Sequence, residues 1–178
     1  MTSWKQAFAR AWWSGSAAAI LSGVALAICG KLERNSAAAP LNGPSQWLWG
    51  ESAARRRRAS VRETVSGYVI HHAVSIGWAT LHEKYAARRH DSLARDGLAA
   101  AATAGIACFM DYAVARGRLR PGFEKHLGVG SLAAVYAAFA LGLALDRSRA
   151  RALSNRARAG LHQGSFAKVP TSSPAART

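Results

Sequence analysis

Charged residues are gathered into short clusters along this chain, and the clusters leave four long stretches without charge. These uncharged stretches are residues 11–30, 64–82, 97–110 and 127–145. A helix needs roughly 20 mainly apolar residues to cross a hydrocarbon core about 30 Å thick. Three stretches meet that length, and the third reaches it when Asp111 is included. The pattern predicts an all-α protein, a four-helix transmembrane bundle with helices at about 11–30, 64–82, 97–115 and 127–145.

The composition changes where that bundle ends. Residues 147–178 mix Arg, Ser, Ala, Gly and Pro with few bulky apolar side chains, so they cannot bury enough surface to offset the entropy of ordering. We expect residues 1–146 to form a four-helix membrane domain and residues 147–178 a basic, largely disordered tail. Half of the whole chain is hydrophobic and its mean hydropathy is −0.02. It is therefore the segregation of apolar residues, rather than their number, that favours a membrane protein.

The formal net charge of +15 raises another hypothesis, because clustered Lys and Arg are typical of nucleic-acid binding. Here the basic residues flank the uncharged stretches, as membrane insertion favours. We expect no nucleic-acid partner, and contact with the lipid bilayer and its anionic headgroups instead. The main candidate for headgroup contact is the run Arg55, Arg56, Arg57 and Arg58, with a specific anionic-ligand site as the alternative.

The loop between the first two predicted helices combines helix breakers with two tryptophans. Pro and Gly between residues 40 and 50 favour turns, and Trp47 with Trp49 is typical of the headgroup region. We expect an interfacial or shallow re-entrant loop that contacts headgroups. An ordinary loop anchored by its tryptophans is the alternative.

The first helix also has features of a cleaved signal peptide, because Lys5 and Arg10 precede its apolar stretch and three alanines follow at 37–39. Charges between residues 31 and 34 interrupt the approach to those alanines, so we expect a retained anchor. Lys and Arg nearly balance across a four-span topology, so the positive-inside rule barely separates the two orientations. We expect both termini in the cytoplasm, since Lys5 and Arg10 precede the first helix and the tail is basic.

Small residues recur every four positions along three of the predicted helices. The stripes are Gly15, Ala19, Gly23 and Ala27; Gly97, Ala101 and Gly105; and Gly130, Ala134, Ala138 and Gly142. In lipid, such stripes allow close backbone approach between helices. They predict helix packing and favour a homo-oligomer, with chance spacing in an alanine-rich chain as the alternative.

The second helix carries two titratable residues, His71 and His72, near the middle of its span, where an ionisable group is costly. Residues spaced by three or four positions share one helix face. The face that includes His71 contains Thr64, Tyr68, His71, Ser75, Trp78 and His82. His72 lies about 100° further round the helix and is expected to face a different neighbour.

Asp111 is the second unusual residue, because a carboxylate costs on the order of 2.5 to 3.5 kcal/mol at the bilayer centre and less near the edge. Antiparallel second and third helices would bring it to the depth of Tyr68, one turn from the histidines. The candidate intramembrane cluster is therefore Tyr68, His71, His72, Ser75 and Asp111. It either relays protons or ties helices together by hydrogen bonds, which we favour. Asp111 turning towards the interface is a third alternative.

No catalytic, nucleotide-binding or metal-binding motif stands out, and we expect neither an enzyme nor a bound cofactor. Cys29 and Cys108 lie inside uncharged stretches, and neither has a second thiol nearby in the sequence. We therefore expect them to be small buried hydrophobic residues rather than disulfide or zinc ligands. Haem held by two histidines is the remaining hypothesis. It needs histidines at matching depth on facing helices, and His126 lies only at the edge of the fourth helix.

Three segments carry a resemblance to known proteins. They are residues 41–50 (LNGPSQWLWG), residues 67–78 (GYVIHH and SIGW) and residues 119–124 (LRPGFE) leading into 135–142 (VYAAFALG). Through them the chain resembles a group of small uncharacterised bacterial inner-membrane proteins of unknown function, over about residues 10–146. This resemblance implies a multi-pass protein of the inner (plasma) membrane. A fainter similarity, to the YagU family, rests on its apolar Gly-to-His helix and implies a link to acid resistance.

These features together predict a non-enzymatic integral membrane protein with a structural or stress-related role. The alternative is an oligomeric proton-coupled carrier or channel that uses the His/Tyr/Asp cluster. An enzyme acting on lipid ranks third, because no nucleophile with a neighbouring base is visible.

Overall fold

Every regular element that the structure describes is helical. The computed structural model describes residues 3–86 and 92–145, so the predicted tail at 147–178 lies outside the described residues. The all-α fold class predicted from the sequence is confirmed within those ranges. Four helical segments are long: α1 (Trp4–Arg34), α5 (Ser66–Leu81), α6 (Leu93–Phe109) and the helix Val129–Leu145.

Serine side chains cap the first turns of α1 and α6. The Ser3 side chain accepts a hydrogen bond from the backbone N–H of Gln6 at the start of α1, and the Gln6 side chain accepts one from the backbone N–H of Ser3, which forms a capping box. Ser92 caps α6 in the same way through Arg95. The α1 helix stops at Asn35, whose left-handed backbone (φ 55°) closes the last turn.

Two of the long helices continue into π-helical turns. Val61–Val65 precedes α5 and His82–Ala86 follows it, while Met110–Val114 extends α6. Thus the predicted helix at 64–82 lies inside a longer helical run, and Asp111 lies in a π-helical turn rather than in regular α-helix. Such turns often mark functional sites.

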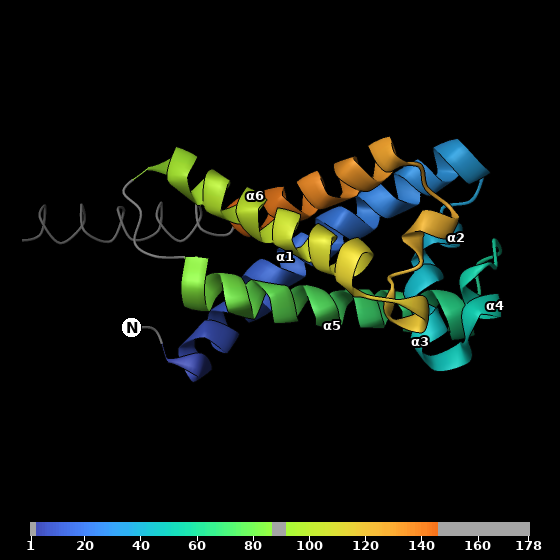
Figure 1. Ribbon diagram of the computed structural model, residues 1–178, viewed down its shortest axis with the longest axis horizontal. Helices are drawn as coiled ribbons and strands as arrows, with labels where there is room; N and C mark the ends of the chain where they lie inside the picture. Colours follow the sequence, from blue (N-terminus) through green and yellow to red (C-terminus); the bar gives the residue numbers. More distant parts are fainter. Residues whose placement is uncertain (1–2, 87–91, 146–178) are drawn as a thin grey trace, which may run out of the picture. The chain divides into compact units, whose positions relative to one another are not determined.

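The two loops that contain the sequence motifs fold into short helical turns. The first loop contains α2 (Ala38–Leu41), the 3₁₀ turn Gly43–Ser45, α3 (Gln46–Trp49) and α4 (Glu51–Ala54). The second contains the 3₁₀ turns Gly117–Leu119 and Phe123–Lys125. Hydrogen bonds join the two loops, and both lie at the same end of the long helices (Figure 1).

Consecutive long helices run antiparallel, because contacts between them move in opposite directions along the chain. On α1, Gly15 lies against Ile76 and Gly23 against Tyr68. Gly142 lies against Ala18, while Leu26 clusters with Val135. Thr103 of α6 bonds His82, which follows α5, and Asp111, in the turn after α6, bonds Tyr136 of the last helix. In Figure 1, α6 runs opposite to both of these neighbours. The polar side chains of the long helices are thereby brought between them.

Mostly small residues fill the space between the helices, and most large apolar side chains point outward; Leu26, Phe139 and Leu143 are buried exceptions. Buried positions on α1, α5 and α6 are mainly alanine, glycine and serine. By contrast, Trp13 is 71% exposed, Leu98 72% and Ile106 57%. Two helices, Trp4–Arg34 and Leu93–Val114, are long and apolar enough to cross a membrane.

The three predicted small-residue stripes differ in whether they face a neighbouring helix or point outward. Gly15, Ala19 and Gly23 of the first stripe are buried against α5 or its neighbours. In the third stripe Gly142 is in close contact, since a Cβ there would lie 2.4 Å from Cα of Ala18, while Gly130 is exposed. The second stripe faces outward, because a Cβ at Gly97 or Gly105 meets nothing within 4 Å.

Candidate functional site

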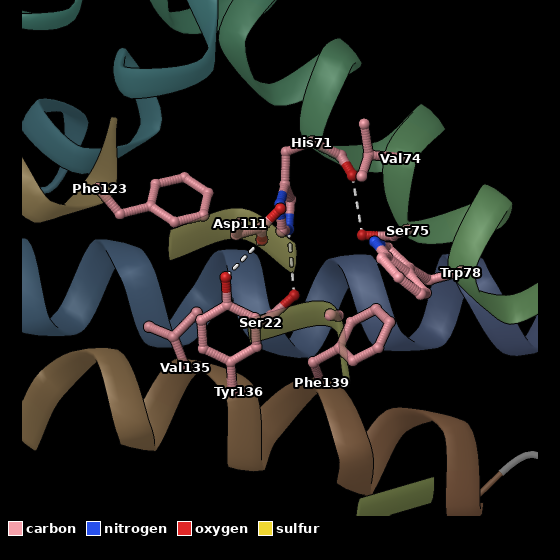
Figure 2. A pocket seen from close by; sticks show the side chains of 11 residues that line it. Ser22, His71, Val74, Ser75, Trp78, Asp111, Phe123, Val135, Tyr136 and Phe139 are labelled. Carbon is pink, nitrogen blue, oxygen red and sulfur yellow. Dashed lines mark hydrogen bonds between the residues drawn. The ribbon is translucent and has the colours of Figure 1, made fainter. Parts of the chain in front are cut away.

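A small cavity lies among the long helices, with His71 and Asp111 in its wall (Figure 2). Its volume is about 40 Å³, which is room for a few water molecules at roughly 10–15 Å³ each. The lining residues are Ser22, His71, Val74, Ser75, Trp78, Ala107, Asp111, Phe123, Val135, Tyr136 and Phe139. The cavity is mostly apolar, with a few hydroxyl, imidazole and carboxyl groups at its edge.

The ring of His71 is oriented by the backbone and a serine of α1. Its Nε2 lies 3.0 Å from Oγ of Ser22 and 3.3 Å from the carbonyl oxygen of Ala19. The Ser22 hydroxyl already donates its proton to the carbonyl of Ala18, at 2.6 Å, so its oxygen can only accept from histidine. Both neighbours of Nε2 are therefore acceptors, and Nε2 carries the proton while Nδ1 is left as an acceptor.

His72 is oriented in the same way by a serine that lies six residues earlier on α1. Its Nε2 lies 3.0 Å from Oγ of Ser16, whose hydroxyl donates to the carbonyl of Trp12 at 2.6 Å. Nε2 of His72 is thus the donor, and Nδ1 accepts a long bond of 3.4 Å from the hydroxyl of Tyr68. His72 was expected to face a different neighbour from His71, but both rings reach α1.

Asp111 bonds the last helix rather than the second one. The hydroxyl of Tyr136 donates to Oδ2 of Asp111 at 2.5 Å, whereas the sequence predicted a set of Asp111 with Tyr68 and a histidine. The structure separates Tyr68, which bonds His72, from Asp111, which shares the cavity wall with His71. The cause is the fourth helix, which supplies a phenol at the depth of Asp111.

Two further polar groups lie beside this pair. The ring of Tyr112 packs edge-on against Tyr136, with centroids 6.2 Å apart, and the carboxylate of Glu124 is near enough to Asp111 to repel it. The hydroxyl of Tyr112 and Oε2 of Glu124 are buried without a hydrogen-bond partner among the described residues. Buried polar atoms without partners are rare and call for an explanation.

Ser75 lies in the wall of the same cavity without bonding another helix. Its hydroxyl donates to the carbonyl of His71 at 2.8 Å, one turn back along α5. Serine and threonine often satisfy their hydroxyl in this way inside apolar helices. Ser75 therefore contributes a small polar surface to the cavity but no link between helices.

The face predicted on the second helix contacts different partners along its length. At one end Thr64 donates to Oδ1 of Asn42 in the first loop, at 2.6 Å. At the other end Nδ1 of His82 lies 2.9 Å from the hydroxyl of Thr103 on α6, and the His82 side chain is buried. The polar stripe thus joins the second helical segment to its neighbours at several depths.

The two loops form a docked unit that sequence reasoning treated as separate motifs. Nε2 of His126 donates to the carbonyl of Ala54 at 2.6 Å, and Nε of Arg34 donates to the carbonyl of His126 at 2.8 Å. Burial lowers the pKa of His126, and the nearby Arg34 adds to that effect, while the bond to Ala54 opposes it. The docked loops therefore favour the neutral ring of His126.

The conformation of the arginine run is held by hydrogen bonds to its backbone carbonyls. Nδ2 of Asn42 donates to the carbonyls of Arg56 and Arg58, at 2.9 and 3.2 Å, and Ser36 donates to that of Arg57. The Arg55 side chain pairs with Glu51 at 2.7 Å, and Arg56 pairs with Glu63 at 3.4 Å.

The paired tryptophans lie on the surface of the first loop and have mixed surroundings. Nε1 of Trp49 donates to the hydroxyl of Ser66 at 3.1 Å, and the guanidinium of Arg62 lies 4.4 Å from a Trp49 ring centroid. Trp47 is 40% exposed, and its Nε1 donates to the carbonyl of Arg120 in the second loop. Each ring thus keeps an apolar surface outward and a polar atom bonded, as interfacial tryptophans do.

The sequence pointed to His71, His72 and Asp111, but it did not predict the residues to which they bond. Ser16 and Ser22 give no signal of their own, because serines inside an apolar helix usually bond their own backbone. Tyr136 and Glu124 lie within motifs singled out for resemblance, but nothing in the sequence links them to Asp111. Within residues 3–86 and 92–145 there is no group of three or more His, Cys, Asp or Glu side chains that could hold a metal ion.

Comparison with family models, curated proteins and solved structures gives no match for this chain. The resemblance to small bacterial inner-membrane proteins, and the fainter one to the YagU family, therefore stay predictions. The function has to be argued from the geometry of the site itself.

Proposed function

We propose that this chain is a non-enzymatic, multi-pass protein of the bacterial inner membrane, a four-helix transmembrane bundle with a structural or stress-related role. The observation that carries the proposal is the distribution of side chains, with alanine, glycine, serine and histidine between helices and most of the large apolar residues outside. A soluble bundle would place its large apolar residues inside. An outer surface this apolar is suited to lipid.

The burial of the two longest apolar helices supports the same proposal. In a soluble protein, an apolar helix of this length would be a core helix and mostly buried. Here only 39% of the apolar window of Trp4–Arg34 and 22% of that of Leu93–Val114 are buried. Helix packing through small residues, as at Gly15 and Gly142, is how helices associate where lipid removes the hydrophobic driving force.

Tryptophans near both ends of the long helices are consistent with two headgroup regions. Trp12 and Trp13 are exposed near the start of α1, and Trp47 and Trp49 lie in the first loop at the other end. At about 1.5 Å per residue, the 31 residues of α1 extend roughly 46 Å, longer than a hydrocarbon core about 30 Å thick. The exposed arginines of the first loop would then meet anionic headgroups.

The test of membrane placement is extraction and labelling of the full chain in bacterial membranes. An integral protein stays in the pellet after alkaline carbonate treatment and is released by detergent. Single cysteines introduced at the exposed positions Ser52 and Leu119, in a background without Cys29 and Cys108, should both react with an impermeant maleimide from the periplasmic side. Release by carbonate, or labelling of only one of the two loops, would overturn the four-span bundle.

A structural role fits the bonds that His71 and His72 make, because each ring ties α5 to a serine of α1. The outward stripe of Gly97, Ala101 and Gly105 favours association with a second copy. Chemical crosslinking of the protein in native membranes, compared with a Gly105→Leu variant, tests that association. A monomer in both preparations would remove self-association from the proposal.

The second candidate function is an oligomeric proton-coupled carrier or channel. The observation that favours it is the cavity with an imidazole and a carboxyl group in its wall, since such groups mark proton pathways in membranes. Proton flux into liposomes, measured for wild type, His71→Ala and Asp111→Ala, separates the two functions. Flux in the wild type that both variants abolish supports the carrier, and absence of flux with only a loss of stability supports the structural role.

A further inference from the structure

A second, larger cavity lies between the two docked loops, outside the site described above. Its volume is about 250 Å³, slightly below the range of about 300–1,000 Å³ typical of sites for drug-sized ligands. Five of its lining residues are charged: Glu51, Arg118, Arg120, Glu124 and Lys125. The others are Gln46 and Gly117, so the wall contains no large apolar side chain and suits a small polar group.

The walls of this loop cavity are fixed by hydrogen bonds between the loops. Nε2 of Gln46 donates to the carbonyl of Arg120 at 2.5 Å. The guanidinium of Arg118 donates back to the carbonyl of Gln46, from Nε at 3.3 Å and from Nη2 at 3.2 Å. Gly43 and Gly122 allow the loops to touch, because a Cβ on either would lie 2.8 Å from the backbone of the other loop. The cavity therefore exists before any ligand enters it, which lowers the entropic cost of binding.

The charges around the loop cavity do not all neutralise one another. Nζ of Lys125 lies 3.3 Å from Oε1 of Glu51, and hydrogen bonds from Arg55 and Lys125 lower the pKa of Glu51. These residues therefore form a local ion-pair group. Arg118, Arg120 and Glu124 remain, none of them in an ion pair recorded among the described residues.

The two arginines keep donors available for an anion. Recorded bonds of Arg118 use Nε and Nη2, and those of Arg120 use Nε to Ala115 and Nη2 to Tyr112. A guanidinium has five N–H groups, so the Nη1 atoms of both residues are not used by these bonds. Two guanidinium groups at one cavity are typical of phosphate recognition.

Glu124 supplies the opposite charge. One of its oxygens is buried without a hydrogen-bond partner within the described part of the chain, and its charge is close enough to repel Asp111. Glu124 also lines the loop cavity, so a cationic donor bound there would offset its negative charge. The cavity therefore offers a phosphate-binding side and an ammonium-binding side.

We propose that the loop cavity binds a phosphoethanolamine group, with the phosphate at Arg118 and Arg120 and the primary ammonium at Glu124. This inference rests on the proposed membrane placement for its source, since the cavity then lies at the headgroup level beside Trp47 and the group belongs to phosphatidylethanolamine. Soluble phosphoethanolamine has the same chemistry and is the other source. A choline headgroup has no N–H to donate, and a glycerol headgroup has no positive charge.

The experiment measures which lipid the full-length protein retains. The protein is incubated with vesicles of equimolar phosphatidylethanolamine, phosphatidylcholine and phosphatidylglycerol, repurified in mild detergent, and its bound lipids are counted by mass spectrometry. We expect ethanolamine lipid to exceed choline lipid about tenfold, as one charge-assisted hydrogen bond can provide. Glu124→Gln should bring that ratio close to one while leaving the helical content unchanged.

The matched control is the pair Arg57→Gln and Arg58→Gln, in the same loop region but outside the cavity wall. It should lower the retention of phosphatidylglycerol without changing the ethanolamine-to-choline ratio. Equal retention of all three lipids by the wild type, or a ratio unaffected by Glu124→Gln, would overturn the proposal.

A second experiment distinguishes a lipid headgroup from a soluble ligand, and it separates a failure of this proposal from a failure of the membrane placement. Soluble phosphoethanolamine is titrated against the purified protein by calorimetry, with inorganic phosphate as the comparison. Suppose that carbonate releases the protein from membranes, and that it still binds phosphoethanolamine in a way that Glu124→Gln weakens. This result would support the loop cavity with a soluble ligand and would overturn the membrane placement. Equal binding of inorganic phosphate shows that the ammonium is not recognised, and overturns the proposal.

Discussion

Nε2 of His71 on α5 lies 3.0 Å from Oγ of Ser22 on α1, and the serine hydroxyl is already committed to the carbonyl of Ala18. The histidine is therefore the donor and the serine the acceptor. A protonated ring would keep this bond, but its second N–H would then need an acceptor in a mostly apolar cavity. The geometry thus favours a neutral ring that ties two helices.

Removing this bond should weaken the contact between α1 and α5 by a small amount. Polar bonds between membrane helices contribute on average about 0.6 kcal/mol and at most about 1.7 kcal/mol. We expect a double-mutant cycle of Ser22→Ala and His71→Ala, measured by unfolding in mixed micelles, to give a coupling energy within that range. A coupling of zero would show that the observed contact does not hold the helices together.

The pair of Ser16 and His72 is the matched comparison for that cycle. The two atoms are also 3.0 Å apart, and the serine again donates to its own helix. The coupling energy should therefore be similar. A large coupling energy for Ser22 and His71 with none for Ser16 and His72 would indicate that the cavity beside His71 adds stability beyond the hydrogen bond between the helices.

A methyl group added at Gly142 should destabilise the bundle, whereas one added at Gly105 should not. The new Cβ at Gly142 would lie 2.4 Å from Cα of Ala18, but at Gly105 it would meet nothing within 4 Å. Overpacking typically costs about 1–3 kcal/mol, so Gly142→Ala should lower the free energy of unfolding by about that amount. Equal stability of Gly142→Ala and Gly105→Ala would mean that the last helix does not approach α1 this closely.

Helix positions could be predicted from the sequence because charge and apolarity are segregated along it. The predicted helix at 11–30 lies within Trp4–Arg34, and that at 127–145 nearly coincides with Val129–Leu145. The extra turns of α1 were not predicted, since they contain charges such as Lys5 and Arg34. Caps and helix packing, rather than apolarity, decide where such turns end.

The partner of Asp111 could not be predicted, because depth alone does not determine which helix a side chain faces. Tyr68 and Tyr136 both offer a phenol, and only the rotation of α6 against the last helix selects Tyr136. The docking of the two loops was also missed. It depends on backbone acceptors such as the carbonyls of Ala54 and Arg120, which have no sequence signature.

Replacing Asp111 by asparagine should separate a packing role from a proton-relay role. The asparagine carbonyl oxygen can still accept from the hydroxyl of Tyr136, so the stability should change by less than about 1 kcal/mol. An amide cannot take up and release a proton, so any proton flux that uses this position should disappear. Tyr136→Phe is the comparison, because it removes the hydrogen bond but keeps the carboxyl group.

Liposome flux and micelle unfolding are measured on the same preparations of both variants. Under the proposed structural role, wild type and Asp111→Asn show neither flux nor a difference in stability. Proton flux in the wild type that is lost in Asp111→Asn, while the stability stays unchanged, would replace that role with the carrier.

The docking of the two loops should weaken in acid because of His126. Its pKa is lowered in the docked state, chiefly by burial, so the undocked loop binds the proton more readily. The docked state is therefore fully stable above the ordinary pKa of about 6.5. It loses stability as the pH falls below that value, until the lowered pKa is reached.

The slope of this loss cannot exceed one proton, or about 1.4 kcal/mol per pH unit. This loss of stability can be followed by hydrogen-exchange protection factors, which are corrected for the intrinsic pH dependence of exchange. The reporter is the amide of Leu127, which bonds the carbonyl of Phe123 inside the docked loop. His126→Gln is the control, because a glutamine amide can donate to the carbonyl of Ala54 but does not titrate. If wild type and His126→Gln lose protection equally between about pH 7 and pH 5, another group controls the docking. If only the wild type loses it, protonation of the buried His126 ring is what weakens the docking.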